Sequence, residues 1–286
     1  MPVTVHLVRH AQGEHNLSHD AELLPDPSLT ALGLTQCAAL HASFPHHADL
    51  THLVASPMRR TIQTCLASFA PSSSDSDSDP DSGSGSVSGS ASVSATPGLP
   101  VILLPKLQEI GPWPCDTGSP TALLETEFGA QIDTRRVHAE PEWTRKREEG
   151  NLHQAVFAQI EKRALAARQE LQQIARDYRA REGGDTDVHM AVVSHGAFLH
   201  FLSGCFYEIP RRTATVWSNA AYRTFTFADP TLQDENAELV ETQESWNAVH
   251  GADKQRPTTA EEKKELQEAY KKLVGVYLSD EWQQRK

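Results

Sequence analysis

The chain is poor in cysteine and in positive charge, and it has no long hydrophobic run. Its four cysteines show no paired spacing, which argues against a disulfide framework and against a zinc ribbon. No apolar stretch has the length of a membrane span, and no charged-then-apolar leader precedes the first expected strand. The 26 lysines and arginines against 38 acidic residues give a formal net charge of −12, which is a poor match to nucleic acid. We therefore expect a cytoplasmic protein with no nucleic-acid partner and no membrane partner.

Several chemical motifs are absent as well. There is no Gly-rich loop followed by Lys-Ser/Thr, so hydrolysis of the P-loop type is excluded. Cys205 and Arg211 have the C-x5-R spacing of cysteine phosphatases, but no glycine between them lets backbone amides converge on a phosphate. The four histidines between His41 and His52 lack a helical pair followed by a carboxylate, which is the usual metal-binding pattern. We expect no metal and no cofactor.

Residues 71–98 are almost entirely Ser, Asp and Gly, with very few large apolar side chains. Such a segment cannot bury a core, so we expect a disordered insertion. The preceding helix should start at the ligand-binding edge of the sheet and end at the opposite edge. The insertion should therefore lie away from the site.

Short β-branched segments alternate with helical patterns, and this predicts one large α/β domain with additions. The expected strands are 3–8, 51–55, 101–104, 188–193, 221–227 and 239–241. The expected helices are 29–42, 58–69 and 152–181, followed by a helix that a capping box opens at Thr259 and Glu262.

Four expected strands are followed by residues suited to phosphate chemistry. Arg9 and His10 follow the first strand, Arg59 the second, Glu109 the third and His195 the fourth. The carboxyl ends of strands in an open α/β sheet are where ligands bind. A guanidinium binds phosphate oxygens through two N–H groups, and a neutral imidazole has a lone pair that can attack phosphorus.

Four motifs in this order resemble the histidine phosphatase superfamily, also called phosphoglycerate mutase-like. They read RHA…HN, SPMRRTIQT, LQE and VVSHGAFL, and the resemblance covers roughly residues 3–227. It implies a three-layer α/β/α sandwich with a mostly parallel central sheet. The strings PCDTGS and WSNAAYRTFTF are similar to a fungal branch of broad-specificity phosphatases in that superfamily.

The resemblance also implies a role for each matching residue. His10 would be the nucleophile and Glu109 the proton donor. The phosphate-binding residues would be Arg9, Asn16, Arg59 and His195.

We expect a histidine phosphatase-like domain at residues 1–249, with a cap region at 110–150 because this segment follows Glu109, and a C-terminal amphipathic helix extension at 250–286. The helix either packs on the parent domain or forms a dimer contact, and the sequence does not specify the oligomeric state. Basic residues at 135–136 and 145–147 could bind a second anionic group, although a run of charges usually forms a solvated face.

The function implied is hydrolysis of a small phosphorylated metabolite through a phosphohistidine intermediate. One alternative is a phosphomutase, but such relatives usually carry a Gly after Arg-His and then Glu-Ser-x-Trp-Asn, and here the sequence after His10 differs. The other alternative is a non-catalytic pseudoenzyme scaffold, which the presence of His10, Glu109 and His195 argues against. The sequence does not identify the physiological substrate.

Overall fold

The computed structural model describes residues 2–70, 98–184, 186–209, 215–257 and 259–279. The expected insertion at 71–98 therefore lies, except for its last residue, outside the described residues. Within the described ranges, no helix combines the length and the apolar character needed to cross a membrane.

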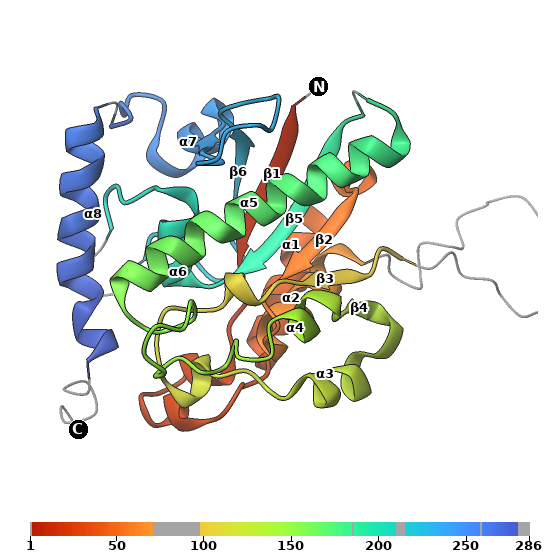
Figure 1. Cartoon of the computed structure of the whole chain (residues 1–286), viewed down its shortest axis with the longest axis vertical. Helices are drawn as coiled ribbons and strands as arrows, with labels where there is room; N and C mark the ends of the chain where they lie inside the picture. The colour runs from red at the N-terminus through yellow and green to blue at the C-terminus, as the bar shows by residue number, and fades with distance from the viewer. Residues whose placement is uncertain (1, 71–97, 185, 210–214, 258, 280–286) are drawn as a thin grey trace, which may run out of the picture.

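A seven-stranded sheet forms the centre of the molecule, in the order β4-β3-β2-β5-β1-β6-β7 (Figure 1). Its strands are β1 Val3–Arg9, β2 His52–Ala55, β3 Val101–Leu103, β4 Ile132–Asp133, β5 Val188–Ser194, β6 Tyr222–Phe227 and β7 Leu239–Glu241. The first five strands in this order are parallel to one another. β6 runs antiparallel to β1, and β7 antiparallel to β6. The prediction of a mostly parallel α/β sheet is confirmed.

Helices cover both faces of the sheet and bury a separate core on each (Figure 1). One core contains side chains of α5, α6 and α8, and the other contains side chains of α1, α2, α3 and α4. The helices are α1 Ala31–Ser43, α2 Arg59–Phe69, α3 Thr121–Phe128, α4 Arg135–Ala139, α5 Phe157–Glu182, α6 Gly196–Ser203, α7 Gln243–His250 and α8 Ala260–Val274. Short 3-10 helices are η1 Glu14–Asn16, η2 Asp20–Leu23, η3 His47–Asp49, η4 Pro105–Leu107, η5 Pro114–Asp116, η6 Gly129–Gln131 and η7 Gly275–Leu278.

The carboxyl ends of three central strands meet at one edge because of the strand register. Arg9 at the end of β1 pairs with Ser194 of β5, and Ala55 at the end of β2 pairs with Val193. Residues that directly follow these strands, such as His10 and His195, are therefore close neighbours.

The six expected strands are all present, and the structure differs from the prediction at one additional strand and at the start of one helix. The two-residue β4 was not predicted, because so short a strand has no periodicity to detect. The long helix begins at Phe157 and not at residue 152, because the Ala155 amide donates to the Lys146 carbonyl (2.8 Å) and Val156 is extended. Val156, which lies inside the expected helix range, is 41% exposed.

The expected capping box at Thr259 and Glu262 is present, and it opens α8. This helix packs on the parent domain: Tyr270 and Val274 are buried in the same core as α5 and α6.

Candidate active site

A cavity of about 190 Å³ lies at the carboxyl edge of the sheet. Its polar and charged lining residues include Arg9, His10, His15, Asn16, Glu22, Arg60, Glu109, Asp116 and Thr215. The structure thus brings together Arg9, His10, Asn16 and Glu109 from the sequence prediction. His195 contacts this group from beneath, and Arg59 lies elsewhere.

His10 follows β1 directly, and its backbone amide donates to the Ser194 carbonyl at the end of β5 (2.9 Å). The side chain is 2% exposed, and its Nδ1 lies 2.7 Å from the Ala11 carbonyl. A carbonyl only accepts hydrogen bonds, so Nδ1 carries the proton and Nε2 keeps its lone pair. Burial, followed by the charge of Arg60, lowers the pKa of His10 well below its ordinary value. His10 is therefore a neutral side chain with a lone pair on Nε2.

His195 follows β5 and is fully buried beside His10, with ring centroids 5.2 Å apart. Its Nδ1 accepts a hydrogen bond from a terminal nitrogen of Arg60 (3.0 Å). Since a guanidinium can only donate, the proton of His195 is on Nε2. Burial, together with Arg60, lowers the pKa of His195 well below its ordinary value. His195 is thus a neutral side chain that presents an N–H group.

Three buried N–H groups at this site have no hydrogen-bond partner among the described residues: Nε of Arg9, Nε of Arg60 and Nε2 of His195. A buried donor without a partner costs about 1–3 kcal/mol. An anion that accepted from these groups would remove that cost. The arrangement is typical of a binding site for an oxyanion.

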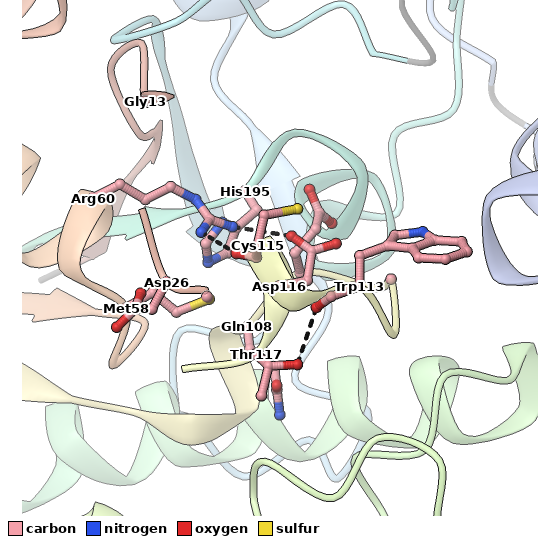
Figure 2. A network of polar contacts seen from close by, with 12 residues as sticks. Gly13, Asp26, Met58, Arg60, Gln108, Trp113, Cys115, Asp116, Thr117 and His195 are labelled. Atoms are coloured by element: carbon pink, nitrogen blue, oxygen red, sulfur yellow. Dashed lines mark hydrogen bonds and ion pairs between the residues drawn. The ribbon is translucent and has the colours of Figure 1, made fainter. Parts of the chain in front are cut away.

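Arg60 is fully buried and held from several sides (Figure 2). One terminal nitrogen donates to the Cys115 carbonyl (2.6 Å). The other donates to a carboxylate oxygen of Asp116 (3.1 Å) and to His195. These contacts fix the orientation of the guanidinium before any ligand arrives.

Arg59, which the sequence placed at the phosphate site, does not line the cavity. Its Nε donates to Glu127 (2.7 Å), a terminal nitrogen donates to Ser119 (2.9 Å), and its backbone amide donates to Asp26 (3.0 Å). Successive residues of a helix point about 100° apart, so the first two residues of α2 cannot both face the cavity. Arg60 occupies the position predicted for Arg59.

Glu109 lies at the N-terminus of α6. Its Oε1 accepts from the amides of Ile110 and Phe198, both at 2.9 Å, and its Oε2 accepts from the Ala197 amide (3.2 Å). The carboxyl group is therefore fixed at the cavity wall. Asn16 is oriented in a similar way, because its Oδ1 accepts from the Gly13 amide (3.1 Å) and its NH₂ group remains as a donor.

Sequence reasoning missed three residues of the site besides Arg60. His15 has its ring 5.3 Å from that of His10, and burial lowers its pKa to about 2. Burial raises the pKa of Asp116 to about 6. Lys146 is 3% exposed and donates to the carbonyls of residues 109, 111 and 116 at 2.7, 2.6 and 2.9 Å. The sequence signal for Lys146 was misleading, since it lies in a charged run that otherwise looks solvated.

The suggested second anion site is not found at the cavity. Arg135 pairs with Asp133 (2.6 Å), and Arg136 pairs with Glu170 (2.8 Å). The ammonium group of Lys146 already donates to three backbone carbonyls. The residues of the 110–150 segment that line the cavity lie between Ile110 and Asp116. The helices α3 and α4 of this segment pack in the core that also contains α1 and α2.

Comparisons with known proteins match the part of the chain that contains the first two motifs. Residues 5–79 match the model of the histidine phosphatase superfamily, branch 1. A probable phosphatase of Schizosaccharomyces pombe is 27% identical over 145 residues, which are 50% of this chain and 57% of that protein. The chain thus spans little more than half the length of this curated relative.

Two solved structures are similar to this one over most of both chains. The ecdysone phosphate phosphatase of Bombix mori is 16% identical, with 80% of this chain and 93% of that chain covered and a TM-score of 0.48. A structure described as mycobacterial hydrolase 2 is 16% identical, with 94% and 99% covered and a TM-score of 0.48.

The matched segment, 5–79, is the part of the sequence that contributes Arg9, His10, Asn16 and Arg60 to the cavity. The remaining motifs follow in the expected order and supply Glu109 and His195 to the same place. In these motifs, and over the matched segment, the chain is similar to the histidine phosphatase superfamily.

Proposed function

We propose that the protein is a metal-independent phosphomonoesterase that hydrolyses a small phosphorylated metabolite through a phosphohistidine on His10. The observation that carries this proposal is the lone pair of His10 Nε2 beside three buried and unpaired N–H groups. A phosphate group provides both the atom for the nucleophile and the oxygens for the donors.

In the first step, His10 Nε2 attacks phosphorus and the bond to the alcohol oxygen breaks. Arg9, Arg60 and His195 donate to the equatorial oxygens, where the negative charge of the transition state is spread. Asn16 adds its NH₂ group at the cavity wall. The three principal donors are buried and already oriented, so little reorganisation is needed when the charge develops.

Glu109 handles the proton in both steps. In its protonated form it gives a proton to the departing alcohol oxygen. As a carboxylate it then takes a proton from water, which attacks the phosphohistidine and releases inorganic phosphate. The second step restores both His10 and the protonated Glu109. General-acid help of this kind is typically worth about 10²–10⁴ in rate.

The test is to substitute His10→Ala and follow turnover of p-nitrophenyl phosphate together with trapping of a phosphoenzyme by a detergent quench at alkaline pH, where phosphohistidine is stable. Both signals should disappear while the melting temperature stays close to that of the wild type. His52→Ala is a matched control, because His52 is the first residue of β2 and does not line the cavity at the carboxyl edge of the sheet. Undiminished turnover in the His10 variant would reject the proposal.

Exhaustive chelation should leave activity intact, and vanadate should inhibit. Activity that is lost on chelation and restored by a divalent ion would reject metal independence.

A further inference from the structure

The C-terminal part of the chain forms one wall of the active-site cavity. Val274, at the end of α8, and Tyr277, in η7, both line it. Trp113 lines it as well, and its indole N–H donates to the Tyr277 carbonyl (2.8 Å). Segments more than 150 residues apart are thus joined into a single surface, which we call the C-terminal wall: Trp113, Val274 and Tyr277.

The C-terminal wall lies next to the group that serves the leaving oxygen. α8 packs against α6 at its first turn, where the Tyr270 hydroxyl lies 3.5 Å from the Ala197 carbonyl. The amide of the same Ala197 binds Glu109. Since Glu109 has to reach the alcohol oxygen, the rest of the alcohol must leave the phosphate on the side of α8 and η7.

The wall itself is apolar where it is most enclosed. Trp113 is 6% exposed, and Val274 is fully buried. The indole N–H of Trp113 is already used by the Tyr277 carbonyl, so the ring presents apolar surface to the cavity. Ile110, 3% exposed, continues this surface toward Glu109.

The cavity offers no cation to a second anionic group. Among the described residues that line it, Arg9 and Arg60 are the only lysines or arginines, and both belong to the phosphate half. His10 and His15 have pKa values lowered by burial and are neutral. The carboxylates of Glu22 and Asp116 also face the cavity and would repel a further negative charge.

We propose, on the basis of the phosphatase function above, that the C-terminal wall selects the alcohol part of the substrate. The preferred substrates are monoesters of uncharged, apolar alcohols, aromatic ones above all, with no second phosphate or carboxylate. Tyr277 and Trp113 are specificity-determining residues that contact the alcohol.

The experiment measures binding of three stable phosphonates by calorimetry, so that its readout does not depend on turnover. Phenylphosphonate presents an aromatic group, methylphosphonate presents almost none, and phosphonoacetate presents a carboxylate. Wild-type protein should bind phenylphosphonate about tenfold more tightly than methylphosphonate, and phosphonoacetate most weakly. Tyr277→Ala should abolish most of this preference while changing the affinity for methylphosphonate by less than about twofold.

Two further variants guard against misfolding. Trp113→Phe keeps an aromatic ring and loses only the hydrogen bond to the Tyr277 carbonyl, so it should retain part of the preference. Tyr178→Ala removes a half-buried tyrosine packed against the same core but outside the cavity, and it should leave all three affinities unchanged.

Phosphonoacetate binding more tightly than phenylphosphonate would overturn the inference. Equal losses for all three ligands in Tyr277→Ala would do the same. In either case a phosphoenzyme trapped on His10 would leave the proposed phosphatase function standing. Failure of the wild type to bind any phosphonate and to form a phosphoenzyme would reject both.

Discussion

At the residue scale, the rotation of α2 about its own axis decides which of two adjacent arginines reaches the cavity. The sequence offers Arg59 and Arg60 equally, since both follow the same strand and both can bind phosphate. Asp26 and Glu127 hold Arg59 on one side of the helix start, and Asp116 and His195 hold Arg60 on the other. Only the tertiary partners distinguish the two, and they come from distant parts of the chain.

Arg60→Ala should lower kcat/KM for phosphate monoesters by about 100-fold or more, because removing one oriented donor to a developing oxyanion typically costs that much. Arg59→Ala, the neighbouring control, should change kcat/KM by less than about threefold, since its contacts lie on a partly exposed surface. Steady-state kinetics on p-nitrophenyl phosphate measures both. A larger loss in the Arg59 variant than in the Arg60 variant would show that the side chains are arranged differently.

Glu109→Gln should affect substrates according to their leaving groups. Loss of the acid should reduce kcat/KM for an alkyl phosphate far more than for p-nitrophenyl phosphate, whose leaving group needs little protonation, as long as the first step limits. The comparison between substrates matters more than either value, because the new amide also disturbs the contacts with three backbone N–H groups. Equal losses for both substrates would argue against an acid role.

At the element scale, the sequence predicts what depends on local periodicity and misses what depends on distant partners. The strands ending in Arg9, Ala55 and Ser194 are β-branched or apolar runs, so they were located within a residue or two. The start of α5 was not located, since it depends on a backbone hydrogen bond to Lys146. The edge strand β4 was not located either, since it depends on a two-residue pairing with β3. His10 and His195 directly follow β1 and β5, and Glu109 follows β3 by way of η4, as the positions of the strands predicted.

Lys146 anchors the segment that carries Glu109, Trp113 and Asp116, because its ammonium group holds three backbone carbonyls of that segment. Lys146→Met should leave those carbonyls without a partner and lower the free energy of unfolding by about 1–3 kcal/mol. The loosened segment should also raise KM. Denaturant unfolding and kinetics measure the two effects.

Lys146→Arg serves as the comparison for the same element. It keeps a positive charge and several donors, but its planar group does not match the geometry of the ammonium. It should recover part of the stability lost in Lys146→Met. If both variants were as stable and as active as the wild type, the three carbonyl contacts would have no structural importance.

At the scale of the whole molecule, the cavity lies at the carboxyl edge of the sheet, and the Ser/Asp/Gly segment joins the described chain at the amino edge. α2 begins beside the cavity, which its second residue Arg60 lines, and it ends at Phe69. The ring of Phe69 lies 6.2 Å from that of His47, shortly before β2 starts. Where the chain is described again, β3 begins at Val101, which pairs with Leu53 near the start of β2. Both attachment points are therefore at the amino edge, across the domain from His10.

This arrangement predicts that the segment is dispensable for catalysis. Replacing Ser72 to Thr96 with a short Gly-Ser link should leave kcat and KM nearly unchanged, because neither attachment point touches the cavity. Stability should be the same or slightly higher, since each halving of a loop's length saves only about 0.6 kcal/mol of closure entropy. Kinetics on p-nitrophenyl phosphate and thermal unfolding of the two proteins provide the measurements. If the shortened protein kept its fold but its kcat/KM shifted tenfold, the segment would have to act at the site, and attachment at the opposite edge would not be enough to separate them.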